Sequence, residues 1–158
     1  LWGLSGVPAA SLGTLGLMTP KDCYPTNLTT PDAALLHEHL NKLTQDNIDH
    51  LTLEASSHGL AQNRLDGVQI SIAAFTNLSR DHLDYHITFD NYFSAKVRLF
   101  SEILVSNGVA VLNKGDRSFE VLSATAIARG ARVLSYGWEG KDIRLLDIHP
   151  GRGIDDSR

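Results

Sequence analysis

The sequence contains one cysteine, Cys23, among its 158 residues, which excludes an intramolecular disulfide and a multi-cysteine zinc site. It also has no basic run: 14 Lys and Arg face 18 Asp and Glu, for a net charge of −4. This balance argues against a nucleic-acid-binding surface or a polybasic membrane anchor. No apolar run approaches the roughly 20 residues that a membrane-spanning helix needs. We therefore expect a cytoplasmic protein without nucleic-acid or membrane partners.

A phosphate-binding loop of the form G-x-x-x-x-G-K-[ST] is also absent from the sequence. The segment Gly13-Thr14-Leu15-Gly16 does not replace it, because it lacks the lysine that neutralises phosphate charge. The sequence begins with Leu1 rather than Met, and residues 151–158 show neither helical nor strand periodicity. We expect a piece of a longer protein, cut on both sides, with some functional residues outside it.

Apolar residues make up 42% of the sequence, and their periodicity predicts alternating helices and strands. Helices are expected over 30–42, 88–104 and 119–128, and strands over 50–55, 71–76, 108–112, 132–136 and 143–148. Thr30 is expected to cap the first helix, with Pro31 in its first position. This alternation predicts an α/β fold, a mainly parallel sheet flanked by helices. In such sheets ligands bind beyond the carboxyl ends of the strands.

Polar side chains gather after the strand predicted over 50–55. They include Glu54, Ser56, His58, Gln62 and Arg64. A carboxylate offers a hard oxygen ligand to Mg²⁺, and Ser, Gln and Arg donate hydrogen bonds to carboxylates or phosphates. The same composition also fits a solvated loop with a turn at Gly59, because polar loops commonly follow strands. Both interpretations stay open on the residues alone.

A second polar group follows the strand predicted over 71–76. It contains Asn77, Asp81, His82, Asp84 and His86. Asp and His are common metal ligands, although their spacing does not match the H-E-x-x-H zinc signature. One interpretation is a metal-dependent hydrolase built on Asp81, His82, Asp84 and His86. The other is a solvated loop in which Asp and His side chains pair with each other.

Lys96 lies at the edge of the apolar stripe of the helix predicted over 88–104, between Phe93 and Phe100. Burial there would lower the pKa of its amine and let the free amine react with CO₂, giving a carbamate that binds metal. The alternative is a lysine whose ammonium group reaches water. Residues predicted to lie on the surface are Arg98, His37, His39, His50 and His149.

Four motifs in order resemble the central domain of the Mur ligases over about residues 11–136. They are LTTPD at 28–32, EASSHGL at 54–60 with Gln62 and Arg64, FTNLSRDHLDYH at 75–86, and Ala95-Lys96. The nearest type adds the third residue to UDP-N-acetylmuramoyl-L-alanyl-D-glutamate. The resemblance implies an ATP-dependent amide ligase of peptidoglycan synthesis, whose central domain is a P-loop-type ATPase. It also implies an acyl-phosphate intermediate, displaced by the amine of meso-diaminopimelate or L-lysine.

Residue roles are implied by the same resemblance. The residues implied to bind the UDP-muramoyl-dipeptide are Thr29, Thr30, Ser56, Gln62 and Arg64. Those implied as Mg²⁺ ligands and catalytic residues are Glu54, His82 and Lys96, the last as a carbamate. Asn77 is a further candidate for the nucleotide site. The cofactors expected on this basis are ATP and Mg²⁺.

The resemblance further implies that residues 1–158 form a partial central domain. The phosphate-binding loop, the N-terminal uridine-binding domain and the C-terminal domain are expected to lie outside this sequence. We therefore expect a monomer that is inactive by itself. Two alternatives stay open: a folate polyglutamate ligase, which shares the fold, and the hydrolase built on Asp81 and His82.

Overall fold

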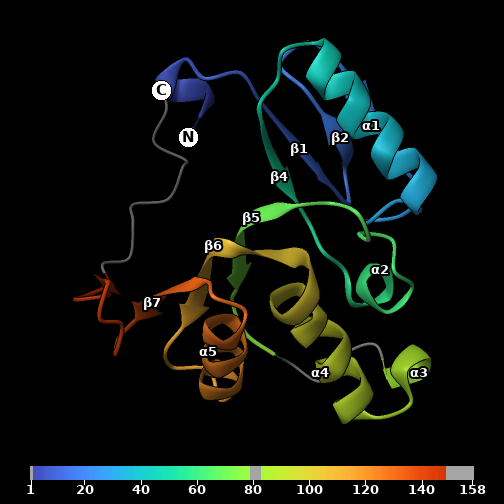
Figure 1. The fold of residues 1–158 in the computed structure, drawn as a ribbon. Helices are drawn as coiled ribbons and strands as arrows, with labels where there is room; N and C mark the ends of the chain where they lie inside the picture. Colours follow the sequence, from blue (N-terminus) through green and yellow to red (C-terminus); the bar gives the residue numbers. More distant parts are fainter. Residues whose placement is uncertain (1, 79–82, 149–158) are drawn as a thin grey trace, which may run out of the picture.

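The structure, a computed structural model, describes residues 2–78 and 83–148, which contain two four-stranded sheets (Figure 1). The strands of the first sheet, in spatial order, are β3 (Cys23–Tyr24), β2 (Gly16–Met18), β1 (Ala9–Gly13) and β4 (His50–Leu53). β1 pairs with β4 in parallel and with β2 in antiparallel orientation. The parallel register sets Leu12 opposite Leu53, so β1 and β4 end at the same edge.

The second sheet is entirely parallel. Its strands are β5 (Ile70–Phe75), β6 (Leu104–Asn113), β7 (Arg132–Gly137) and β8 (Ile143–Arg144), in that spatial order. The predicted α/β fold with mainly parallel strands is confirmed. Its division into two sheets was not predicted, and it arises because β4 and β5 do not pair with each other.

Helices lie on one face of each sheet. They are α1 (Ala33–Gln45), α2 (Ser57–Ala61), α3 (Leu83–His86), α4 (Phe89–Arg98) and α5 (Phe119–Ala128), with a 3₁₀ turn η1 (Gly3–Ser5) and a π-helical turn η2 (Leu99–Ile103). Figure 1 shows α1 along the first sheet and α4 and α5 beside the second. α2 packs against α4, so it joins the two halves of the molecule.

Two apolar cores correspond to the two sheets. Leu12, Leu36 and Leu60 belong to the core of the first sheet. Phe100 and Leu112 belong to the core of the second. Parallel strands need apolar cover, and these two clusters provide it on the sides that face the helices. The strand edges and loop ends that the clusters do not cover are left for a ligand.

The helix starts follow local hydrogen bonding, and one prediction there is wrong. Asp32, not Thr30, caps α1: its side chain accepts the Leu35 N–H at 3.0 Å. Pro31 precedes the cap, because the chain is still extended there. Thr88 caps α4 by accepting the Asn91 N–H at 3.1 Å, and this start agrees with the prediction.

Other element ends differ from the sequence prediction. The helix predicted over 88–104 changes to the wider π-helical η2 after Arg98, and β6 already begins at Leu104. The strand predicted over 143–148 covers only Ile143–Arg144. Gly59 lies inside the short helix α2 rather than in a turn. Apolar periodicity continues from α4 into η2, so it could not locate the first of these changes.

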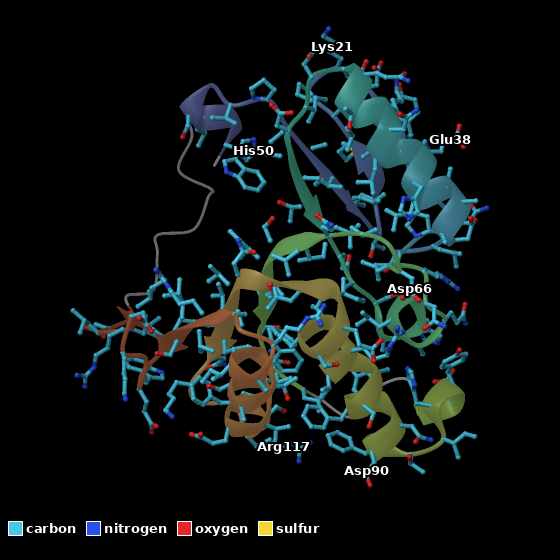
Figure 2. All side chains as sticks on the ribbon, viewed as in Figure 1. Lys21, Glu38, His50, Asp66, Asp90 and Arg117 are labelled. Carbon is cyan, nitrogen blue, oxygen red and sulfur yellow. The ribbon has the colours of Figure 1, made fainter. Side chains whose placement is uncertain are left out.

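Arg98 and His39 are less exposed than predicted. Arg98 donates to the Leu60 carbonyl at the end of α2, to Asp66 Oδ1 at 3.2 Å and to Glu102 Oε2 at 2.8 Å. Asp66, labelled in Figure 2, lies in the loop after α2, so this guanidinium fastens α2 to α4. His39 is buried on the inner face of α1.

Within the described ranges, no helix has the length and apolarity of a membrane span.

We predict that Arg98→Met lowers the free energy of unfolding by about 1–2 kcal/mol. Most of this loss comes from the Leu60 carbonyl, because ion pairs with the exposed Asp66 and Glu102 contribute little. Urea denaturation followed by circular dichroism measures the change. Arg144→Met, on the exposed strand β8, is the matched control and should have no effect. Equal losses in both variants would contradict the fastening role.

Candidate functional site

A cleft of about 1260 Å³ lies between β4 and β5. Each strand pairs along one edge only, β4 with β1 and β5 with β6, so their unpaired edges face the cleft. Polar side chains line the cleft at the carboxyl ends of the strands. They include Thr29, Glu54, Ser56, Arg64, Asn77 and Lys96. The cleft therefore brings together residues that are far apart in the sequence and that were predicted as site residues.

Glu54 follows the last residue of β4, and its backbone N–H still donates to the Leu12 carbonyl at 2.9 Å. Its side chain is exposed and meets the turn between β1 and β2. There Thr14 donates to Oε2 twice, from the hydroxyl at 3.1 Å and from the backbone N–H at 3.3 Å. The Thr14 hydroxyl also lies 3.2 Å from that of Thr29. Glu54 is thus held at the polar end of the cleft.

Thr30 is completely buried, and its hydroxyl joins two parts of the site. It donates to the Glu54 carbonyl at 2.7 Å and accepts the Ser56 N–H at 2.9 Å. Arg64 adds a bond from Nη1 to the Thr30 carbonyl at 2.7 Å. These three bonds fix the segment before α1 against the end of β4 and leave the neighbouring Thr29 at the cleft surface.

Ser56, Gln62 and Arg64 form the rim around α2. Ser56 caps this helix by accepting the Gly59 N–H at 3.0 Å. Gln62 accepts from Arg64 Nε at 3.1 Å and donates to the Tyr85 hydroxyl at 2.9 Å. Arg64 lines the cleft. Gln62 is not a lining residue, but its bond with Arg64 orients the Arg64 side chain. The rim presents hydrogen-bond donors and positive charge, which suits an anionic ligand.

Lys96 is half-buried on α4 and lines the cleft. Its Nζ donates to the Ala55 carbonyl at 3.3 Å. Burial lowers the pKa of this amine below its ordinary value, and the negative charge of Glu54 partly opposes that effect. The structure therefore favours the half-buried interpretation of Lys96 over a side chain extended into water.

Of the predicted metal ligands, Glu54 and Lys96 belong to the described residues and line one cleft. His82 lies outside the described residues. In the portions that are described, no cluster of three or more His, Cys, Asp or Glu side chains is arranged to hold a metal ion. Glu54 and a carbamate on Lys96 would supply oxygen donors at one cleft, which is the ligand type that Mg²⁺ prefers.

The hydrolase alternative also depended on Asp84 and His86. Asp84 is exposed on α3, and His86 is buried among aromatic rings, 5.4 Å from Tyr92 and 5.5 Å from His58 between ring centroids. Neither residue lines the cleft. Asp81, like His82, falls outside the described residues. The structure thus gives no support to a cluster in which Asp84 and His86 join a catalytic metal.

Thr14 is a site residue that the sequence analysis missed. In the sequence it belongs to Gly13-Thr14-Leu15-Gly16, a segment that lacks the lysine of a phosphate-binding loop. The fold places it against Glu54. The strand pairing explains this position: β1 ends in Gly13, β4 ends just before Glu54, and parallel neighbours end at the same edge of a sheet. Sequence alone did not show that these two strands are neighbours.

These features define an α/β domain whose cleft lies at the carboxyl ends of parallel strands and carries an acid, a half-buried amine and a rim of hydrogen-bond donors. The model of the Mur ligase middle domain matches residues 4–155. The chain belongs to the Mur ligase family.

Its relatives share a narrower function. The chain is 46% identical over 153 residues to the UDP-N-acetylmuramoyl-L-alanyl-D-glutamate--2,6-diaminopimelate ligase of Bradyrhizobium diazoefficiens, covering 94% of the chain and 31% of that protein. It is 45% identical over 150 residues to the ligase of the same name from Anaplasma marginale, with 94% and 31% covered. The chain therefore spans about a third of the length of these relatives.

A solved structure agrees with the sequence relatives. A UDP-N-acetylmuramoyl-L-alanyl-D-glutamate--2,6-diaminopimelate ligase superposes with a TM-score of 0.77 at 35% identity, covering 89% of this chain and 28% of that one. The relatives named above do not favour the folate polyglutamate ligase or the hydrolase.

We predict that Gly59→Ala destabilises the chain by about 1–3 kcal/mol. A Cβ at this position would lie 2.7 Å from Thr30 Cβ and Cγ2, inside a buried contact. Alanine normally favours a helix, so propensity would predict the opposite sign. Thermal unfolding measures the change, and Gly3→Ala, with no atom within 4 Å of the added Cβ, is the control. Unchanged stability of Gly59→Ala would show that Thr30 can move.

Proposed function

We propose that this chain is the central part of an ATP-dependent ligase that joins 2,6-diaminopimelate to UDP-N-acetylmuramoyl-L-alanyl-D-glutamate in peptidoglycan synthesis. The observation that carries the proposal is the shared cleft, where Glu54 and the half-buried Lys96 meet the anion-binding rim at the end of β4. Membership of the Mur ligase family and the names of the relatives support the same reaction.

We assign the UDP-muramoyl-dipeptide to the rim. Ser56 and Arg64 line the cleft and offer a hydroxyl and a guanidinium group to an anionic substrate, and Thr29 lines the cleft beside them. Thr30 and Gln62 act from behind: Thr30 fixes the segment that presents Thr29, and Gln62 bonds to Arg64. In this arrangement the substrate carboxylate that is to be activated lies near Glu54 and Lys96.

We infer that Lys96 reacts with CO₂. The ammonium group first loses a proton to solvent. The lone pair of the resulting amine then forms an N–C bond while one C=O π bond of CO₂ opens and its electron pair moves to oxygen. The nitrogen loses a second proton to solvent, so that a cation has become an anion. That anion would repel the nearby Glu54 carboxylate unless a cation lies with them, which supports Mg²⁺ binding by Glu54, the Lys96 carbamate and His82. When bound, Mg²⁺ supplies positive charge that neutralises the transferring phosphoryl group.

We infer that the phosphate-binding loop for ATP comes from outside these 158 residues. The unpaired edges of β4 and β5 face each other across the cleft, which suits the insertion of one further strand. Ile72 on β5 is 63% exposed, although parallel sheets are normally covered on both faces. A strand followed by a helix would cover both features, and Asn77 lies where it could meet the nucleotide. We place this ligase in the cytoplasm as a monomer.

Carbamate formation has a direct test. We predict that ¹³C-bicarbonate gives a protein carbamate NMR signal at a lower pH than surface lysines require, because burial lowers the pKa of Lys96 and leaves more free amine at a given pH. Lys96→Arg should abolish this signal, and Lys141→Arg, at an exposed site, should keep it. A signal that survives in Lys96→Arg would contradict the assignment.

The reaction itself is tested in the complete ligase that contains this chain. We predict ADP release only when UDP-muramoyl-dipeptide and diaminopimelate are both present. Lys96→Ala should lower kcat about 100-fold or more, and a short carboxylic acid should restore part of it, because it replaces the missing carboxylate. Lys141→Ala is the control. Unchanged turnover of Lys96→Ala would contradict the role of Lys96, and failure to bind UDP-muramoyl-dipeptide in calorimetry would favour a folate substrate.

A further inference from the structure

The turn between β1 and β2 closes over the Glu54 side chain. A Cβ at Gly13 would lie 2.9 Å from Glu54 Oε2 and 3.3 Å from Glu54 Cβ, so glycine permits this approach. The next residue, Thr14, then directs both its backbone N–H and its hydroxyl to the same oxygen, Oε2. Within the described residues, Oε1 receives neither of these bonds.

The hydroxyl groups of Thr29 and Thr14 and the carboxylate of Glu54 form a chain of hydrogen bonds that all point in one direction. Glu54 can only accept when ionised, so the single hydroxyl proton of Thr14 is donated to Oε2, at 3.1 Å. The contact of 3.2 Å between the Thr14 and Thr29 hydroxyls must then use the proton of Thr29. Thr29 is left with lone pairs at the cleft, where a ligand group that donates a hydrogen bond fits.

We propose that Thr14 is a positioning residue that orients the Glu54 carboxylate and links it to the substrate-binding hydroxyl of Thr29. This inference rests on the proposed function, in which Glu54 binds the metal ion and Thr29 the substrate. By occupying Oε2, Thr14 leaves Oε1 for the cation. Groups that hold a metal ligand in place commonly affect metal affinity about 10–100-fold.

The test is a titration of the 158-residue chain with Mn²⁺ in bicarbonate buffer, in which free Mn²⁺ is followed by electron paramagnetic resonance. Thr14→Val has nearly the same shape but lacks the hydroxyl, and it should weaken Mn²⁺ binding about 10-fold. Thr14→Ser keeps the hydroxyl and should stay within about 2-fold of the wild type. Thr44→Val, at an exposed position of α1, is the matched control and should not change the affinity.

Two further readouts separate the explanations. Thr14→Val and Thr14→Ser should have similar thermal unfolding temperatures. A merely structural role of Thr14 would instead appear as a difference in stability between these two variants. If Glu54→Gln binds Mn²⁺ as tightly as the wild type, or the wild type binds none, the metal role in the proposed function is wrong, and with it this inference. If Glu54→Gln loses binding while Thr14→Val keeps it, the inference about Thr14 alone is overturned.

Discussion

The buried hydroxyl of Thr30 is the interaction on which the site depends. With one donated and one accepted bond it joins the segment before α1 to the end of β4 and to the start of α2. Gly59 lies so close that no larger residue fits beside Thr30, and Arg64 bonds to its carbonyl. Moving this side chain would displace both the segment that presents Thr29 and the backbone that carries Glu54.

The cleft combines two opposed electrostatic tendencies. Burial disfavours a charged amine at Lys96, whereas the Glu54 carboxylate favours it, and burial has the larger effect. The pKa of this amine is therefore lower than that of a surface lysine, although a carboxylate lies nearby. The fold achieves this by placing Lys96 on α4, which Arg98 fastens to α2, instead of on a loop that could move out to solvent.

The sequence predicted the elements better than their arrangement. Apolar periodicity found α1, α4, α5 and most strands, and the motifs predicted six residues that line the cleft, among them Glu54 and Lys96. It placed the cap of α1 wrongly, because Thr30 and Asp32 are both favoured cap residues and only the fold shows that the Thr30 hydroxyl bonds to Glu54 at the end of β4. Thr14 was missed because its role depends on which strands are neighbours.

The π-helical turn η2 has a consequence for how the molecule can deform. It directs Ile103 into the core of the first sheet, whereas Phe100 and Leu104 belong to that of the second. Both halves therefore pack against one π-helical turn, whose hydrogen bonds close a wider ring than those of α4. A relative rotation of the two halves would have to repack residues 99–103, because Ile103 lies in one core and Phe100 and Leu104 lie in the other. The packing of this turn therefore sets a limit on how far the space between β4 and β5 can widen or narrow.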